Sequence, residues 1–300
     1  MQPTGEAQTR ELVGRTETAH PYAIFPSRSF DPTLTGQELN LRNNDTLHRR
    51  LIGVIPAAGQ GTRLAPFLYP KELLPIVYAT VGRNGRDVVP RPVLQFSLDA
   101  MKLAGITECI IVIANWKLEI PRVLGDGDGS GISLSYVMRN FPRGLADALD
   151  AVQPWVRDQH VGLALPDTVV TPPDALSRLW RECLSSQADL VLGVFPTSTP
   201  EQLGPVQVDS DGMVSQVLDK PTATDLKNTW GLAVWSPQFT EVLHAEVAKA
   251  PQDAKPTLGS VFQHAVDLKL NVRAVCFDDG RYIDVGTPDG LGRVVAGVVL

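Results

Sequence analysis

The stretch IPAAGQGTRLAPFLYPKELLPI, residues 55–76, places a glycine-rich turn directly after the apolar run LIGVIPA. A short run of this kind is typical of a strand that is covered on both faces of a sheet. Gly59 and Gly61 leave backbone N–H groups free to face an anion, because no side chain stands in front of them. Arg63 and Lys71 add two cations beside the turn. We therefore expect this loop to bind a phosphate-rich ligand.

Two familiar phosphate-binding loops do not fit this stretch. A P-loop requires a lysine at a fixed distance after its first glycine, and Gly59 has no such lysine. A dinucleotide-binding loop requires a third glycine where this chain has Leu64. What remains is G-x-G-T-R-L followed by Pro70-Lys71, which suits a polyphosphate because two cations flank one backbone cradle. The alternative interpretation is a glycine turn with two solvated cations.

Apolar runs and amphipathic segments alternate along the chain after residue 51. Strands are predicted over ECIIVIA, ISLSYVM, HVGLALPD and ADLVLGVFP. Helices are predicted over residues 93–105, where Leu94, Leu98 and Met101 share one face, and over residues 144–156 and 173–186. Strands separated by helices indicate βαβ units. We therefore expect an α/β fold with a Rossmann-like, mixed but mostly parallel sheet, helices on both faces, and ligands beyond the carboxyl ends of the strands.

Turn signals and composition divide the rest of the chain. Asp211-Gly212 and Asn84-Gly85 each separate two short apolar runs, and each pair predicts a β-hairpin. Residues 1–49 are polar, rich in turn formers and without a sustained period. We interpret residues 1–49 as a polar N-terminal extension and residues 50–300 as one domain.

The bulk composition excludes several classes of protein. A net charge of −6 offers no basic surface for a polyanion, so we expect no nucleic-acid partner. The sequence shows neither a membrane-spanning run nor a signal peptide, so no membrane partner and a cytoplasmic location are expected. Cys109, Cys183 and Cys276 lie far apart, which argues against a zinc site and predicts inert buried thiols.

The chain resembles the sugar-1-phosphate nucleotidyltransferases, the group of glucose-1-phosphate thymidylyltransferases and UTP–glucose-1-phosphate uridylyltransferases. Their signature reads roughly A-G-x-G-T-R-L/M-x-P followed by P-K-x-L-L-P, and it stands here as AAGQGTRLAP and YPKELLPI. The likeness continues in order through RPVLQFSLDAMKLAGI, RGLADAL, LALPD, LDKP and YIDVGTPDGL. It covers about residues 51–295. The resemblance implies that residues 50–300 form a nucleotidyltransferase domain of the nucleotide-diphospho-sugar transferase type.

The resemblance also implies a reaction. A nucleotidyl group passes from a nucleoside triphosphate to a sugar-1-phosphate, giving a nucleotide-sugar and pyrophosphate, with dTTP or UTP and glucose-1-phosphate as the expected substrates. Mg²⁺ is the expected cofactor, and a homo-oligomer is the expected assembly. Negative charge crowds the reacting phosphates, so catalysis rests on in-line positioning and on metal and cationic groups.

The family's functional residues map onto this sequence in order. Asp167 and Asp284 would hold the metal, although either alone could be a helix cap or a turn aspartate. Arg63 and Lys71 would contact the triphosphate, and Lys220 the phosphate of the sugar. The residues implied for the nucleotide are Ala57, Ala58, Gly59, Gly61, Thr62, Arg139 and Gly144. The residues implied for the sugar are Gly204, Asp219, Trp230 and Gly231, of which Trp230 could equally belong to the core.

The sequence departs from the family pattern at three positions. Arg139 replaces the glutamine that reads thymine or uracil, which leaves the base open. Thr168 replaces an asparagine, and Asp219 replaces a glutamate that is one methylene longer, which leaves the sugar open. Two other functions therefore stay in view: a cytidylyltransferase for another phosphorylated alcohol or a phosphonate, and a catalytically lapsed regulatory protein that binds nucleotide-sugars. Retention of Asp167 and Asp284 argues against the lapsed protein.

Overall fold

The computed structural model describes residues 50–67, 69–81, 87–251 and 253–296. The interpretation of residues 1–49 as an extension falls outside these ranges. Within them the helices and strands alternate as the sequence predicts. No helix in the described ranges is long and apolar enough to cross a membrane.

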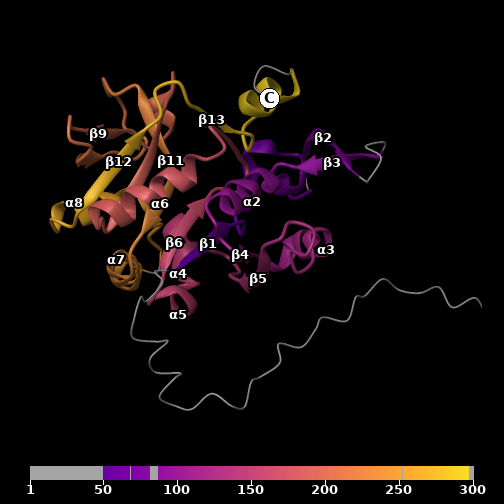
Figure 1. Cartoon of the computed structure of the whole chain (residues 1–300), viewed down its shortest axis with the longest axis horizontal. Coiled ribbons are helices and arrows are strands. Elements are labelled where there is room, and N and C mark those ends of the chain that lie inside the picture. The colour runs from indigo at the N-terminus through magenta and orange to yellow at the C-terminus, as the bar shows by residue number, and fades with distance from the viewer. Residues whose placement is uncertain (1–49, 68, 82–86, 252, 297–300) are drawn as a thin grey trace, which may run out of the picture. The chain divides into compact units, whose positions relative to one another are not determined.

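A seven-stranded sheet in the order β12-β8-β11-β6-β1-β4-β5 forms the centre of the described chain (Figure 1). β1 runs parallel to β4 and β6, β4 runs parallel to β5, and β8 runs parallel to β12, whereas β11 is antiparallel to both of its neighbours. The strands are β1 (Leu51–Pro56), β4 (Glu108–Ile113), β5 (Ser133–Met138), β6 (His160–Ala164), β8 (Leu190–Pro196), β11 (Asn228–Trp235) and β12 (Val272–Cys276). The mixed, mostly parallel sheet is confirmed.

Helices cover both faces of this sheet, as predicted. Along β1, Val54 and Ile55 point to opposite faces and belong to different apolar clusters. The Ile55 cluster contains residues of α2 (Leu94–Leu103), α3 (Glu119–Leu124) and α6 (Ala175–Ser186). The Val54 cluster contains residues of α4 (Leu145–Asp150), α5 (Gln153–Val156), α7 (Pro237–Lys249) and α8 (Leu258–Asp267). Leu94, Leu98 and Met101 are buried, as their spacing predicts.

Two expectations need correction. The single helix predicted over residues 144–156 is two helices, α4 and α5. Pro154 explains the break, because proline lacks an N–H and its ring would clash with the carbonyl of Asp150 in a continuous helix. Cys109 and Cys183 are buried, but Cys276 is exposed. Cys276 ends β12, an edge strand of the sheet, so one side of it has no neighbouring strand to cover it.

Three smaller two-stranded sheets lie outside the central one. β9 (Val206–Val208) pairs with β10 (Val214–Val217), and β2 (Pro75–Val81) pairs with β3 (Asp87–Pro92), both antiparallel. Both predicted hairpin pairings are therefore confirmed, although the turn at residues 82–86 lies outside the described ranges. β7 (Thr168–Thr171) pairs with β13 (Arg281–Asp284), which comes from the far end of the chain and precedes α9 (Pro288–Val295).

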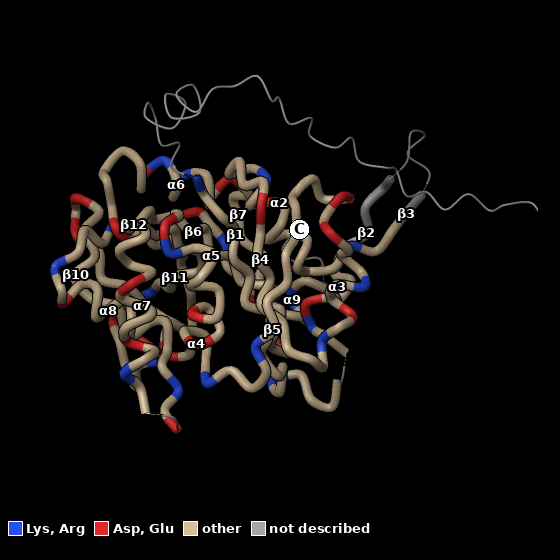
Figure 2. Tube along the Cα trace, turned by 90° about the horizontal axis from the view of Figure 1, so that it is seen from below, with Lys and Arg blue, Asp and Glu red and all other residues tan. Residues whose placement is uncertain are grey.

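One edge of the central sheet gathers the segments that carry the predicted site. The carboxyl ends of β1 and β4 lead into short 3-10 turns, among them η1 (Thr62–Leu64), η2 (Lys71–Leu73) and η3 (Asn115–Lys117). Because β11 is reversed, its first residues lie beside the last residues of β6 and β8: Asn228 pairs with Pro196 and Leu232 with Ala164. Acidic and basic residues are interspersed along the described trace (Figure 2).

Candidate active site

Asp167 and Asp284 meet because β7 and β13 pair. The register sets Asp284 opposite Thr168, and the Val285 N–H donates to the Asp167 carbonyl at 2.8 Å. Ile283 and Val285 are buried in a small apolar cluster. Side chains alternate along a strand, so burial of both neighbours on one face places the Asp284 side chain on the opposite face. Strand pairing thus fixes the two carboxylates that the resemblance implies for the metal.

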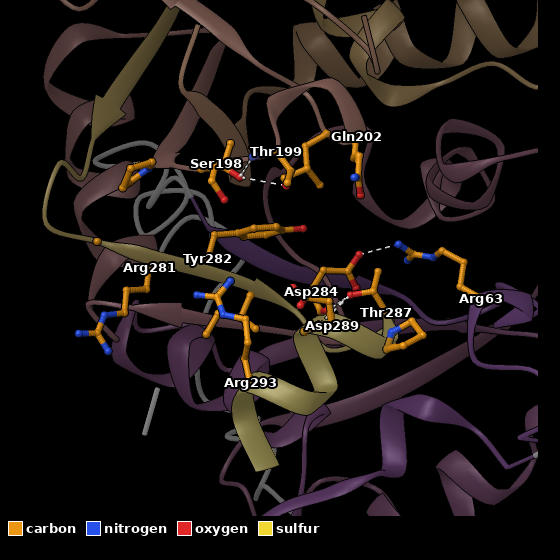
Figure 3. Close-up of a pocket in the computed structure, with 17 residues that line it drawn as sticks. Arg63, Ser198, Thr199, Gln202, Arg281, Tyr282, Asp284, Thr287, Asp289 and Arg293 are labelled. Carbon is orange, nitrogen blue, oxygen red and sulfur yellow. Dashed lines mark hydrogen bonds and ion pairs between the residues drawn. The ribbon is translucent and has the colours of Figure 1, made fainter. Parts of the chain in front are cut away.

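The loop after β1 brings two cations to these carboxylates. Gly61 adopts a left-handed conformation with φ of 69°, which favours glycine, and η1 starts directly after it. The Arg63 guanidinium donates to Asp284 Oδ2 at 2.7 Å (Figure 3). Lys71, the first residue of η2, forms an ion pair with the Asp167 carboxylate. Four predicted residues from separate parts of the sequence therefore form two ion pairs at one place.

Gly286 lies where these groups converge. A Cβ on Gly286 would lie 2.3 Å from Asp167 Oδ2, 2.8 Å from Lys71 Nζ and 2.9 Å from Asp284 Oδ1. Only a residue without a side chain permits so close an approach. The Gly286 N–H also donates to Asp284 Oδ1 at 2.9 Å. We call these five residues the reaction cluster: Arg63, Lys71, Asp167, Asp284 and Gly286.

Charges within the reaction cluster compensate each other. The side chains of Lys71 and Asp167 are 13% and 10% exposed, and that of Asp284 is 16% exposed. Burial disfavours the charged form of Arg63, but the charge of Asp284 and its hydrogen bond outweigh burial and raise the pKa of Arg63. Arg63 therefore stays charged, and each of the two cations already has a carboxylate partner.

The donor set of the cluster fits Mg²⁺. This ion takes oxygen ligands, and proteins commonly bind it with one or two carboxylates while substrate phosphates and water complete the shell. Asp167 Oδ2 and Asp284 Oδ1 both lie within 2.9 Å of one point, the Cβ position of Gly286. Within the described ranges no group of three or more histidine, cysteine, aspartate or glutamate residues could hold a metal. The cluster is thus suited to a metal that shares its shell with a phosphate ligand.

A cavity of about 800 Å³ opens beside the reaction cluster (Figure 3). Arg63 and Asp284 lie at one part of its wall, while Ser198, Thr199 and Gln202 lie opposite, with the Tyr282 ring projecting between them. Burial, with a smaller contribution from the charge of Asp284, raises the pKa of Tyr282 well above its usual value, so its phenol stays protonated. This volume falls in the range of about 300–1,000 Å³ that is typical of small-molecule sites.

None of the residues predicted to bind the sugar lines this cavity, but two of them contact residues that do. Lys220 N–H donates to the Leu203 carbonyl at 2.8 Å, and Leu203 itself lines the cavity. Trp230 N–H donates to the Gly204 carbonyl at 3.0 Å. A side chain on Gly204 would begin 2.2 Å from the Trp230 indole nitrogen. We call the five predicted sugar-binding and acceptor-phosphate residues the acceptor side: Gly204, Asp219, Lys220, Trp230 and Gly231.

Members of the acceptor side differ in their surroundings. The Trp230 ring packs edge-on against Phe262 with 5.2 Å between ring centroids, so it contributes to the core as well. Asp219 and Lys220 are exposed, and neither has an ion-pair partner in the described part of the chain. Gly231 lies against the Tyr282 ring, which is 2.5 Å from the position of a Cβ. No described contact joins the Lys220 side chain to the reaction cluster.

Arg139 and Gly144, predicted near the base, lie at the start of α4. The Arg139 guanidinium donates to both carboxylate oxygens of Asp147, at 3.0 and 2.8 Å, and the Asp147 side chain is fully buried. Arg143 donates to the same carboxylate at 3.0 Å. Gly144 immediately precedes the helix as its N-cap. The geometry therefore gives Arg139 a structural partner in addition to its predicted contact with the base.

The remaining nucleotide residues fall into two groups. Ala57 and Ala58 are buried, and the Ala57 N–H donates to the Val112 carbonyl at 2.7 Å. These residues continue β1 and leave little backbone free for a ligand. Gly59 and Thr62 are exposed and Gly61 is partly exposed, so this part of the loop is open to a phosphate.

Sequence reasoning missed three features of the site: Gly286, Tyr282 and a buried ion pair between Glu72 and Lys117. Lys117 left a signal, because it is a cation just beyond the carboxyl end of an apolar run, where ligands of such sheets bind. Gly286 and Tyr282 lie two residues from Asp284, within the matched YIDVG segment. The pairing of Lys117 with Glu72 had no signal, since the two residues are 45 positions apart in the sequence.

The fold and the reaction cluster define an α/β protein of the nucleotide-diphospho-sugar transferase type. A family model described as nucleotidyl transferase matches residues 52–298, and the chain belongs to this family. A glucose-1-phosphate thymidylyltransferase of Streptomyces antibioticus is 27% identical over 236 residues, which cover 78% of this chain and 62% of that protein. One of Mycolicibacterium smegmatis is 31% identical over 175 residues, which cover 56% of this chain and 55% of that protein.

The structural comparison agrees with the predicted fold. A UTP-bound UGPase from Acinetobacter baumannii superposes with a TM-score of 0.65 at 21% identity, over 83% of this chain and 93% of that chain. The resemblance to the sugar-1-phosphate nucleotidyltransferases is thereby confirmed at the level of family and fold. The matched segment covers 62% and 55% of the two curated relatives' own lengths.

Proposed function

We propose that this chain transfers a nucleotidyl group from a nucleoside triphosphate to a sugar-1-phosphate, releasing pyrophosphate. The observation that carries the proposal is the reaction cluster, in which Arg63 and Lys71 meet Asp167 and Asp284 beside a ligand-sized cavity. A protein that only binds nucleotide-sugars does not need two carboxylates at the point where two phosphate-binding cations converge. Membership of the nucleotidyl transferase family supports the same reaction.

The triphosphate belongs on the side of the loop after β1. Exposed Gly59 and Thr62 offer backbone N–H groups, and Arg63 grips a phosphate with its planar fork of donors. Lys71 adds a point charge on the same side. As the phosphates arrive, these cations exchange their carboxylate partners for phosphate oxygens, and they stabilise the charge that builds up on the pyrophosphate leaving group.

The acceptor belongs in the cavity of about 800 Å³. Lys220 would meet the acceptor phosphate, and Tyr282, whose phenol stays protonated, lines the cavity as a possible donor. The acceptor phosphate is already an anion, so its oxygen can attack the α-phosphate without a protein base. The chain's own residues then act by holding the two phosphates in line.

Asp167 and Asp284 would hold Mg²⁺, which supplies a Lewis acid that neutralises charge on the phosphate oxygens. Both carboxylates are now paired with cations, so a change of partners accompanies loading of the site. This coupling makes metal and triphosphate bind together rather than independently.

For the substrates we propose dTTP or UTP with glucose-1-phosphate. Support comes from the relatives: two similar curated proteins are glucose-1-phosphate thymidylyltransferases, and the UGPase structure holds UTP. Arg139 gives the least support to the choice of base. Its guanidinium is hydrogen-bonded to Asp147, and it carries donors only. A homo-oligomer stays a prediction.

A substrate panel tests the proposal directly. The full chain is incubated with Mg²⁺, glucose-1-phosphate and each of ATP, GTP, CTP, UTP and dTTP, while pyrophosphate release is followed. We expect release with dTTP or UTP, and we expect EDTA to stop it.

Three other outcomes decide between the alternatives. Release with CTP and a phosphorylated alcohol or phosphonate, but not with sugar-1-phosphates, would identify a cytidylyltransferase. Binding of nucleotide-sugars without pyrophosphate release across a panel of sugar-1-phosphates would identify a regulatory protein. Release that continues at full rate in EDTA would contradict the metal assignment.

A further inference from the structure

A buried ion pair lies directly behind the triphosphate loop. Glu72 is the middle residue of η2, and Lys117 is the last residue of η3 after β4. Their side chains are 1% and 4% exposed, and Lys117 Nζ is 2.7 Å from Glu72 Oε1. Both side chains are more deeply buried than those of the reaction cluster.

The pair is poorly suited to stabilising the fold. Burial raises the pKa of Glu72 and lowers the pKa of Lys117, and the opposite charge of the partner acts against each shift. Among the described residues, Glu72 Oε2 finds no hydrogen-bond partner, although it is buried. Buried ion pairs of this kind often contribute less to stability than well-packed apolar side chains would. The presence of the Glu72–Lys117 pair is therefore better explained by a role other than stabilising the fold.

The position of the pair indicates what that role is. Glu72 follows Lys71 in the chain, so the same 3-10 turn presents one side chain to the reaction cluster and the next to Lys117. Two backbone hydrogen bonds of this turn are local, from Leu73 to Pro70 and from Leu74 to Lys71, and a third, from the Val93 N–H to the Leu74 carbonyl at 2.9 Å, ties its end to the residue before α2. They shape the turn but do not fix it against β4.

Lys117 also reaches the loop itself. A small cavity of about 200 Å³ is lined by Gly61, Lys71 and Lys117 together with neighbouring loop residues. The charges of Lys71 and Asp167 also act on the Lys117 ammonium, so the pair and the cluster are electrostatic neighbours. A shift of Lys117 would therefore be transmitted to the position of Lys71.

We propose that the Glu72–Lys117 pair is a positioning pair for Lys71. It ties η2 to the connection after β4, and the tie holds the Lys71 ammonium at Asp167, where the triphosphate arrives. An apolar contact in the same place would fill the space but would leave the turn free to slide, since dispersion contacts have little directionality. This inference rests on the proposed function, because the triphosphate is the ligand whose binding reports the position of Lys71.

Three variants of the full chain test the proposal: Glu72→Gln, Lys117→Met, and the double variant Glu72→Leu with Lys117→Met. Binding of Mg²⁺·dTTP and Mg²⁺·UTP is measured by calorimetry, and Tm is measured in parallel. We expect both single variants to lose Tm and to bind the triphosphate about tenfold more weakly. The double variant should regain Tm, because it removes both charges, but should not regain affinity.

The outcomes separate positioning from mere packing. If the double variant regains both Tm and triphosphate affinity, or if no variant changes affinity, the positioning role is wrong. As a matched control, Glu108→Gln breaks the exposed Arg50–Glu108 pair and should change neither quantity. Wild-type protein that bound no triphosphate would overturn the proposed function together with this inference. Wild-type binding with unchanged variants would overturn this inference alone.

Discussion

The reaction cluster and the acceptor side hold their charges in opposite ways. In the cluster each cation has a carboxylate partner, and the pairing of β7 with β13 fixes the carboxylates. On the acceptor side Asp219 and Lys220 are exposed, without ion-pair partners in the described ranges, and backbone hydrogen bonds fix the segment.

This difference separates the residues expected to carry out the reaction from those expected to select the acceptor. The charges of the cluster are gathered at one place before the substrate arrives, so after they change partners on binding they need little reorganisation during the reaction, which is the basis of electrostatic catalysis. Exposed, solvated charges can adapt to different ligands at low cost, but each contributes modestly to binding. The cluster should therefore determine which reaction occurs, while the acceptor side should determine which phosphate is accepted.

The largest expected effect is on the cluster. Asp284→Asn removes the carboxylate that pairs with Arg63 and that we propose as a metal ligand, and we expect turnover to fall by about 10³-fold, at the upper end of single electrostatic deletions. The measurement is steady-state pyrophosphate release at saturating Mg²⁺. Asp278→Asn is the control, because Asp278 is exposed and is not among the residues that line the cavity. Activity of Asp284→Asn within a few-fold of the wild type would remove Asp284 from the metal site.

An intermediate effect is expected on the acceptor side. Lys220→Met should raise the KM for the sugar-1-phosphate about tenfold, equivalent to roughly 1.4 kcal/mol, and should leave the KM for the triphosphate unchanged. Both constants come from initial rates with one substrate varied at a time. Lys227→Met, an exposed lysine seven residues later, should change neither. If Lys220→Met raised the KM for the triphosphate instead, Lys220 would belong with the reaction cluster, and the division between the cluster and the acceptor side would be wrong.

The smallest effect is expected at Arg139. Burial disfavours the Asp147 carboxylate, but hydrogen bonds from Arg139 and Arg143 outweigh it and lower the pKa of Asp147 below 3.8. Arg139→Gln keeps Arg143 in place, so we expect a loss of about 1 kcal/mol in the free energy of unfolding at pH 7.

The pH dependence of this loss has a definite sign. A depressed pKa in the folded state gives stability above the unfolded value, and that stability is lost as pH falls through the folded value. The Tm difference between wild type and Arg139→Gln should therefore narrow as pH falls below 3.8. A difference that stays constant or widens would show that Asp147 is not the group concerned. Arg157→Gln, an exposed arginine in a surface pair, is the control.

Much of the fold could be predicted because its strands are continuous apolar runs that need both faces covered. The loop residues Arg63 and Lys71 were recognisable because glycines and cations recur at a characteristic spacing. Asp167 and Asp284 were recognisable because each follows an apolar run. The structure brings all four together, which the sequence could indicate only through family resemblance.

What could not be predicted depends on contacts between distant segments. The Glu72–Lys117 pair forms only when two 3-10 turns meet, and the local sequence of neither turn indicates which segment packs against it. Exposure of Cys276 depends on which strand occupies the edge of the sheet, and strand order is not encoded in the local pattern. The break at Pro154 is different, because the proline itself carried the information.

Gly286 gives the site an evolutionary vulnerability. Three charged groups meet where its side chain would begin, so replacing one hydrogen atom by a methyl group would force them apart. The crowding atoms there are side-chain ends of the cluster, which can move without disturbing the sheet. A glycine-to-alanine change needs a single base substitution. A descendant of this chain could thus lose its chemistry in one step while keeping its fold and much of its ligand cavity.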